Sequence, residues 1–396
     1  MDKKDAIVIV GGCRTAVGKM GGSLKDLEAS DLGGIVIREL LKRTGIAPEL
    51  VNEVVFGNVG QAAENAFAAR LCAVKGGLPY ECTALTVNRL CSSGIQAIVT
   101  AAQEIQDGYC DIAIAGGCES MTNIPFYLRK ARYGYRMGHG ELEDGLITAL
   151  SDPFTRYHMG MTAENVAERY HITREMQDRL AYNSQMRAAA ASTAGKFKDE
   201  IVPIEVKVGK KETKIFDTDE HIRPNVTMEG LAKMRPAFKE GGTVTAGNSS
   251  GINDGAAAVL VMKESKAKEL GLKPVVRLVD AAVAGVDPMY MGIGPVPAMG
   301  KLFAKTGLTK EDIDVFELNE AFAAQAAACI QELGLNDEKV NPNGSGIAMG
   351  HPIGATGCII TIKLMNEMVR RGSHYGVASL CIGGGQGIAV LFERCE

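Results

Sequence analysis

Short hydrophobic runs alternate with longer amphipathic stretches along most of the chain. AIVIVGG (6–12), EVVFGNV (53–59) and DIAIAGG (111–117) are short and apolar, as buried strands are. LGGIVIRELLKRTG (32–45) and SGIQAIVTAAQEIQDG (93–108) instead repeat apolar positions every three to four residues, as helices do. Because apolar strands that alternate with helices are typical of sheets covered on both faces, the pattern predicts an α/β fold.

The first and last thirds of the chain resemble each other. The segments 42–58 and 304–320 each read as a helix end, a Thr-Gly stop, a capped turn and a strand. A second pair follows, in which VN at 87 and VN at 340 each lead through a turn and a helix to a glycine-rich strand end. The internal spacings differ, so this weak repeat predicts two similar half-domains and not a solenoid.

The amino-acid composition changes between the two similar parts of the chain. Residues 121–246 are rich in Met, Arg and Tyr, with one amphipathic helix expected near 161–195 and a charged strand pair near 201–216. The strand at 255–262 then returns the chain to the first sheet. We therefore expect an insertion that helps to shape a ligand site.

The expected division has three parts. Residues 1–120 plus 247–271 form the N-terminal half, 121–246 form an inserted loop domain, and 272–396 form the C-terminal half.

Composition narrows the function classes. The 396 residues are 46% hydrophobic and carry a net charge of −4 with both signs well mixed, which disfavours a nucleic-acid binder or a disordered chain. No segment reaches membrane-spanning length and the opening apolar run is too short for a signal peptide, so no membrane association and a cytoplasmic location are expected. The ten cysteines include no C-x-x-C pair and the six histidines form no ligand cluster, so neither disulfides nor a metal site are expected.

Cys91 stands out among the cysteines. It follows an apolar stretch and precedes Ser-Ser-Gly and a strong helical pattern. A thiol at a helix N-terminus lies near the positive end of the helix dipole, which predicts a lowered pKa and a nucleophilic thiolate, and the free N–H groups there can hold an oxyanion. A structural cysteine beside a serine cap is the alternative for this stretch taken alone.

Three further positions have unusual surroundings. His351 lies in a glycine-dense loop before a helix, where backbone can approach a reacting centre closely. Cys381 ends a strand and meets three glycines, which suits either a tight hairpin or exposed amides beside a second thiol. Asn319 sits where a strand meets a helix, where capping is the simpler role. GNSSG (247–251) matches a serine-nucleophile pattern, but neither a strong strand nor a following helix flanks it, so the match is accidental.

Together these segments resemble the thiolase family over essentially the whole chain. The motifs, in chain order, are NRLCSSG, GGCESM, HMGMTAENVAERY, KMRPAF, AGNSSGINDGAAA, GPVPA, NEAFAAQA, GHPIGATG and CIGGGQG. The HMG at 158–160 is similar to the biosynthetic acetyl-CoA acetyltransferase branch. The resemblance implies a five-layered α-β-α-β-α fold of two similar half-domains with an inserted loop domain.

The resemblance also implies ping-pong chemistry. Cys91 attacks acetyl-CoA while His351 takes its proton, and Cys381 then removes an α-proton from a second acetyl-CoA, so that acetoacetyl-CoA and CoA are released. In this family His351 and a water held by Asn319 stabilise the enolate, and the amides of Cys91 and Gly383 stabilise the tetrahedral centre.

The remaining implications concern coenzyme A and assembly. Matching positions imply that His158 and Ser250 line the pantetheine channel, that Phe238 and Met291 form apolar walls, and that Arg223 lies near the nucleotide. Coenzyme A thioesters are then substrates and no separate cofactor is expected. In this family the loop corresponding to 126–136 mainly builds a homotetramer.

The chain departs from the family pattern at Gly230, where a serine is common, at Ser345, where a glycine is usual, and at Met161, where a threonine is usual. These positions bear on acyl-chain preference and CoA affinity. A broader 3-ketoacyl-CoA thiolase and a non-catalytic acyl-CoA or lipid carrier on the same scaffold remain the alternatives.

Overall fold

The computed structural model describes residues 5–209 and 212–395. Residues 1 and 396, which bound the predicted division of the chain, lie outside this part. The two half-domains are built mainly from these elements, in chain order: β1 (Ile7–Thr15), α1 (Ala29–Thr44), β3 (Glu53–Gly57), α2 (Ala68–Lys75), β4 (Thr83–Val87), α3 (Ser93–Gln106), β5 (Ile112–Ser120), β11 (Asn253–Lys263), β12 (Val276–Gly285), α9 (Pro295–Thr306), β13 (Val315–Leu318), α10 (Ala323–Leu333), α12 (Thr356–Arg371), β14 (Tyr375–Ile382) and β15 (Gln386–Arg394).

The strands form one continuous mixed sheet with two parts, here called the first and the second sheet, that meet at one narrow seam. The first runs in the order β4-β3-β5-β11-β1 and the second in the order β12-β15-β14-β13. Strands β1 and β12 join them through only two paired positions, Val8 with Arg277 and Ile9 with Val276. This short seam leaves the two sheets free to diverge around the helices between them.

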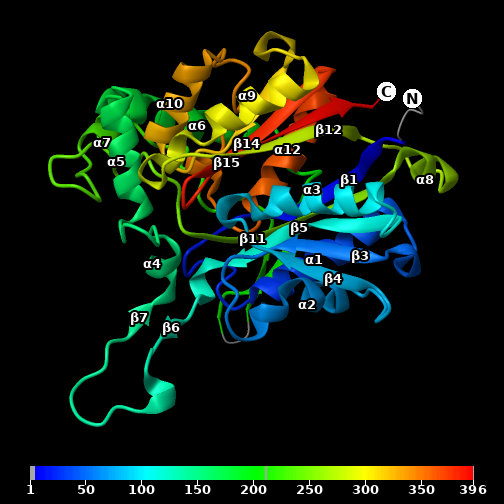
Figure 1. The fold of residues 1–396 in the computed structure, drawn as a ribbon, viewed down its shortest axis with the longest axis horizontal. Helices are drawn as coiled ribbons and strands as arrows, with labels where there is room; N and C mark the ends of the chain where they lie inside the picture. Colours follow the sequence, from blue (N-terminus) through cyan, green and yellow to red (C-terminus); the bar gives the residue numbers. More distant parts are fainter. Residues whose placement is uncertain (1–4, 210–211, 396) are drawn as a thin grey trace.

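Three large apolar clusters lie between the layers of helices and strands, whose arrangement Figure 1 shows. One packs α1 and α2 on the outer face of the first sheet. The second contains the apolar faces of α3 and α12 between the two sheets, and the third packs α9 and α10 on the outer face of the second sheet. The predicted α-β-α-β-α order is therefore confirmed, and the starts of α3 and α12 lie in the central layer.

The two half-domains repeat the same local structure. Helix α1 ends at Gly45 with φ 70° and α9 ends at Gly307 with φ 73°, a left-handed conformation that glycine adopts without strain. A short 3₁₀ turn and a strand follow in each half, and β3 pairs in parallel with β5 as β13 does with β14. The predicted repeat is confirmed.

The segment between β5 and β11 contains several small elements beside the two half-domains. They are η4 (Met121–Asn123), β6 (Phe126–Tyr127), η5 (Ala131–Tyr133), β7 (Glu143–Asp144), α4 (Gly145–Ala149), α5 (Met159–Arg169), α6 (Arg174–Thr193), β8 (Ile201–Val202), β9 (Ile204–Lys207), β10 (Thr213–Phe216) and α7 (Met228–Ala232). The strand pair β9–β10 and the return of the chain through β11, between β1 and β5, agree with the prediction.

The prediction of a single helix near 161–195 is wrong. Helices α5 and α6 are separate because His171 adopts φ 56° and Thr173 caps a new helix by accepting from the Met176 amide. Buried Arg14 of β1 ties this segment to the first sheet through ion pairs of 2.8 Å with Glu200 and 2.7 Å with Asp219.

Candidate active site

A cavity of ≈ 380 Å³ is lined by residues from both half-domains and from the segment between them. Eight of the ten predicted site residues line it: Cys91, His158, Arg223, Phe238, Ser250, Met291, His351 and Gly383. The other two, Asn319 and Cys381, are fully buried and do not line it. Segments that are far apart in the sequence thus meet at one site.

A strained turn presents Cys91 at the start of α3. Leu90, the residue before it, has φ 44°, an unusual conformation for a residue with a side chain. The Ser93 hydroxyl holds this turn, because it accepts from the Arg89 amide at 2.9 Å and donates to the Leu90 carbonyl at 2.7 Å. Ser93, the second serine after the cysteine, therefore shapes the turn that exposes the thiol to the cavity.

The pKa of Cys91 differs from the prediction. Burial raises the pKa of this thiol to about 11, although the amides of Gly383 and of Cys91 itself donate to the sulfur and oppose the shift. The predicted lowering of the Cys91 pKa by the helix N-terminus is wrong, because burial destabilises the thiolate more than these two amides stabilise it. The thiol is therefore neutral at pH 7, with two backbone amides beside its sulfur.

His351 is buried and its tautomer is fixed by a neighbour. The Thr356 hydroxyl donates to the Pro352 carbonyl at 2.8 Å, so toward His351 Nδ1, at 2.7 Å, it acts as an acceptor. Nδ1 then carries the proton and Nε2 keeps its lone pair. Burial lowers the pKa of His351 to about 4, so the ring is a neutral base at pH 7.

Asn319 lies beside the free nitrogen of this ring. Its Nδ2 is 3.5 Å from His351 Nε2, and its backbone amide donates to the Ser379 carbonyl at 2.9 Å. The side-chain oxygen Oδ1 is buried and has no hydrogen-bond partner in the described residues. Asn319 and His351 therefore border the same polar corner of the site.

Cys381 lies in the hairpin between β14 and β15, opposite Gly387. Both interpretations of its glycine run apply, because Gly384 and Gly385 have φ of 78° and 87° for the tight turn while the Gly383 amide donates to Cys91. Burial and then the nearby thiol of Cys91 raise the pKa of Cys381. The two thiols are thus close enough to influence each other's charge.

Four glycines let the His351 loop pack closely against the start of α3, next to Cys91. A side-chain carbon added at Gly117 or at Gly57 would lie 2.1 or 2.7 Å from the Gly354 carbonyl oxygen, and one at Gly94 would lie 3.0 Å from it. This glycine junction consists of Gly57, Gly94, Gly117 and Gly354. It lets the backbone of the second half-domain touch the first turn of α3, which places His351 and Cys91 at one cavity.

The outer cavity wall is aromatic and apolar. His158 stacks on Phe238, with ring centres 4.9 Å apart and planes 14° apart, and Phe238 meets Phe322 edge-on at 6.1 Å. Burial lowers the pKa of His158, so this ring too is uncharged at pH 7. Arg223 supplies a positive charge among the lining residues. An apolar channel with a cation suits a long ligand with an anionic end.

Sequence reasoning missed three residues of the site. Thr356 and Ser93 are ordinary helix-start residues in the sequence, and their roles depend on contacts to His351 and Arg89. His221 also lines the cavity, and burial lowers its pKa to about 4. A lone histidine in a charged loop carries no sequence signal for such a position.

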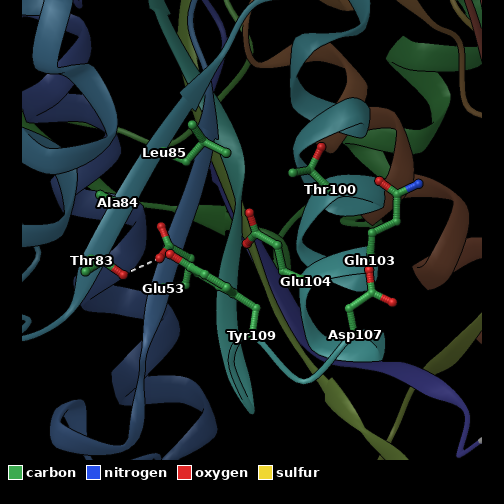
Figure 2. Close-up of a pocket in the computed structure, with 9 residues that line it drawn as sticks. All are labelled: Glu53, Thr83, Ala84, Leu85, Thr100, Gln103, Glu104, Asp107 and Tyr109. Atoms are coloured by element: carbon green, nitrogen blue, oxygen red, sulfur yellow. Dashed lines mark hydrogen bonds between the residues drawn. The ribbon is translucent and has the colours of Figure 1, made fainter.

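Other candidates for a site are less suited to chemistry. A hollow of ≈ 470 Å³ beside the edge strand β4 is lined by Glu53, Glu104 and Asp107, and none of the predicted site residues lines it (Figure 2). Within 5–209 and 212–395 no group of His, Cys, Asp or Glu has a metal-binding arrangement, and no helix there is long and apolar enough to cross a bilayer. Ser249 of the GNSSG segment is buried and donates to the Thr245 carbonyl, as expected for an accidental match.

The fold brings the Cys91 thiol and the neutral His351 imidazole to one cavity between two similar half-domains. Residues 7–265 match the family profile for the thiolase N-terminal domain and residues 272–394 match the profile for the thiolase C-terminal domain. The chain belongs to the thiolase family of acyltransferases.

Curated relatives and solved structures agree along the whole length. "Beta-ketothiolase BktB" of Cupriavidus necator is 54% identical over 98% of this chain and 99% of that protein, and an "Acetyl-CoA acetyltransferase" of Syntrophomonas wolfei is 53% identical over 98% of each. The crystal structure of the Bacillus anthracis acetyl-CoA acetyltransferase has a TM-score of 0.97 at 46% identity and covers 100% of both chains. Human mitochondrial 3-ketoacyl-CoA thiolase in complex with CoA has a TM-score of 0.95 at 44% identity, with 99% of this chain and 98% of that chain covered.

Proposed function

We propose that this protein is an acetyl-CoA C-acetyltransferase that condenses two acetyl-CoA molecules into acetoacetyl-CoA and CoA, and that it works reversibly through an acetyl-Cys91 intermediate. The observation that carries the proposal is the meeting of Cys91, the Gly383 amide and neutral His351 at one apolar cavity. The names of the relatives from Syntrophomonas wolfei and Bacillus anthracis support the choice of acetyl-CoA as substrate.

In the first half-reaction the Cys91 sulfur attacks the thioester carbonyl and its proton moves to His351 Nε2. A neutral thiol and a neutral imidazole need no prior ionisation, so the proton is transferred as the C–S bond forms. The carbonyl oxygen gains negative charge, which the amides of Cys91 and Gly383 stabilise. The C–S bond to CoA then breaks, and the CoA thiolate takes the proton of the Cys381 thiol and leaves.

In the second half-reaction the Cys381 thiolate removes an α-proton from another acetyl-CoA. The enolate oxygen is stabilised by the imidazolium of His351 and by a water that Asn319 holds, and the carbanion attacks the acetyl carbonyl on Cys91. When the C–S bond to Cys91 breaks, His351 returns its proton to that sulfur, and all three groups regain their starting states. Burial suits Cys381 to this step, because a raised pKa makes its thiolate a strong base.

The remaining parts of the proposal concern binding and assembly. His158, Phe238, Ser250 and Met291 line the pantetheine channel, Arg223 meets the anionic end of CoA, and no cofactor beyond the CoA thioesters takes part. The loop between β6 and β7 extends away from the body in Figure 1 and exposes large apolar side chains, with Tyr133 91% and Met137 97% exposed, which favours a homotetramer built through this loop. A cytoplasmic location belongs to the same proposal, and cell fractionation tests it.

A broader 3-ketoacyl-CoA thiolase is the second candidate. It is favoured by the mostly apolar wall near Cys91, where Met121 and Ile353 form a satellite core with the cysteine at its edge. Comparing turnover of acetoacetyl-CoA with turnover of longer 3-ketoacyl-CoAs decides between the two candidates.

The test of the function is a mass measurement. Protein mixed with acetyl-CoA should gain one acetyl group, and peptide mapping should place it on Cys91. Cys118→Ala, which changes a buried cysteine that does not line the cavity, is the control and should still be acetylated. Protein that binds CoA tightly and remains unmodified would instead support the carrier alternative.

A further inference from the structure

Glu119 is a buried carboxylate that the reaction described above does not use. It lies near the end of β5, is 1% exposed, and accepts four hydrogen bonds. Oε1 accepts from Asn58 Nδ2 at 3.1 Å and from the Gly60 amide at 3.0 Å, and Oε2 accepts from the amides of Val59 at 3.0 Å and Gly354 at 2.9 Å. No Lys or Arg forms an ion pair with Glu119 in the part of the chain that the structure describes, so N–H groups alone compensate its charge.

These donors come from two different half-domains. Asn58, Val59 and Gly60 follow β3 in the first, whereas Gly354 belongs to the His351 loop of the second and lies in the glycine junction. One carboxylate therefore bridges the loop after β3 and the loop that carries the histidine base. Because the Gly354 amide is only three residues from His351, the position of Oε2 constrains the imidazole.

The repeat adds an independent observation. In the first half-domain Asn58 directly follows β3. The last residue of β3, Gly57, pairs with Gly117 of β5, and Glu119 lies two positions after Gly117. In the second half-domain Asn319 directly follows β13. The last residue of β13, Leu318, pairs with Ser379 of β14, and Cys381 lies two positions after Ser379. Glu119 is thus the structural counterpart of the proposed acid/base thiol, at the same level of the fold.

Glu119 does not reach substrate itself. It is absent from the cavity lining, and all its lone-pair directions meet N–H donors. Its charge is nevertheless felt in the site, because it raises the pKa of Cys91. Burial raises the pKa of Glu119 to about 7, while the amides of Gly60, Val59 and Gly354 act in the opposite direction.

We propose that Glu119 is a positioning residue for the acyl transfer, which holds the His351 loop against the loop after β3 and so sets the imidazole relative to the Cys91 sulfur. A carboxylate is required because four N–H donors converge on it, whereas a glutamine offers one acceptor oxygen and turns an NH₂ group toward two donors. This inference rests on the proposed acyl transfer at Cys91.

The test uses Glu119→Gln in the full-length protein. We expect the rate of Cys91 acetylation at saturating acetyl-CoA to fall about tenfold or more, the size that the loss of a charge-assisted hydrogen bond from a reacting geometry implies. CoA affinity should stay unchanged, because Glu119 does not line the cavity. The pH midpoint for alkylation of Cys91 by iodoacetamide should move to lower pH, because a negative charge near the thiol is gone.

Glu53→Gln is the matched control. Glu53 is a 4% exposed carboxylate at the opposite end of the same strand pair, it accepts from the Thr83 hydroxyl (Figure 2), and it does not line the cavity. Glu53→Gln should change neither the rate of Cys91 acetylation nor the pH midpoint of Cys91 alkylation. Equal behaviour of the two variants, or wild-type acetylation and alkylation in Glu119→Gln, would overturn the assignment.

A second variant covers the case in which Glu119→Gln does not fold. Asn58→Ala removes one of the four donors and leaves the Gly354 contact in place, so acetylation should fall by a smaller factor. A wild-type rate would then overturn the proposal. Alkylation of Cys91 needs no acyl substrate, so failure of the wild-type protein to acetylate would count against the proposed function, while an unmoved alkylation midpoint would count against Glu119.

Discussion

The hydroxyl oxygen of Thr356 lies 2.7 Å from Nδ1 of His351, and the same hydroxyl donates to the Pro352 carbonyl. The Thr356 hydroxyl has one proton and donates it to that carbonyl. In the hydrogen bond between Thr356 and His351 the donor must therefore be Nδ1–H of the imidazole. The base is thus set in the tautomer that leaves Nε2 free on the side of Asn319. A residue five positions further along the chain therefore decides which nitrogen of His351 is able to accept a proton.

Thr356→Val should slow acetylation of Cys91. The valine keeps the shape and removes the acceptor of the Nδ1 proton, so the wrong tautomer becomes accessible, and a loss of about tenfold or more in the burst of CoA release is expected. Thr356→Ser should restore most of the rate. Thr361→Val is the control, because this buried helix threonine only bonds back to the Gly357 carbonyl at 2.8 Å; a burst equally slow in that variant would contradict the tautomer argument.

The pH dependence of acetylation should reflect a strongly shifted histidine. His351 must be unprotonated to act as a base, and its pKa is lowered to about 4, so the single-turnover rate should fall as the pH drops through about 4 and not near 6.5. Burial raises the pKa of Cys91 to about 11, so no basic limb should appear below about pH 10. Rapid pH-jump quench experiments measure this profile, and a main acidic limb near 6.5 would show that the ring is not desolvated.

A smaller step near pH 7 would have another source. The pKa of Glu119 is raised to about 7, and its charge acts on Cys91. Such a step should disappear in Glu119→Gln, while the limb near 4 should remain.

Cys381→Ser should separate the two half-reactions. The variant should still acetylate Cys91, because His351 receives the first proton and CoA can leave as a thiolate that takes its proton from solvent, while condensation should fall about 100-fold or more with the loss of a general base. Acetyl-enzyme is followed by mass spectrometry and acetoacetyl-CoA by absorbance. Cys329→Ser changes a neighbouring buried thiol that donates to the Gly292 carbonyl at 3.3 Å, and both half-reactions should persist there. Loss of acetylation in Cys381→Ser would show that the division of labour between the thiols is wrong.

Local signals were sufficient for part of the fold and site. A few adjacent residues are enough to predict the helix ends at Gly45 and Gly307 and the helix start after Cys91. The repeat and the position of the candidate nucleophile could therefore be predicted. The break between α5 and α6 could not, because the left-handed residue there is His171 and neither Gly nor Pro marks it.

Other properties depend on residues far apart in the sequence. The pKa of Cys91 was predicted in the wrong direction because the burial that decides it comes from the packed halves around the sulfur and not from the sequence neighbours. The contact between Glu119 and Gly354 spans 235 positions, so no local pattern could reveal it.

Gly117→Ala tests whether the glycine junction sets the distance between histidine and cysteine. The added methyl group would lie 2.1 Å from the Gly354 carbonyl oxygen, so the His351 loop must move away from the first turn of α3. Acetylation should fall about 100-fold, and the free energy of unfolding should drop by about 1–3 kcal/mol, as overpacking of a core does. Gly300→Ala, in helix α9 with nothing within 4 Å of the new carbon, should instead keep the wild-type rate and gain slight stability. Chemical denaturation and the acetyl-CoA burst measure the two quantities, and a folded Gly117→Ala protein with a normal burst would show that the two half-domains do not need this contact to bring the base to the thiol.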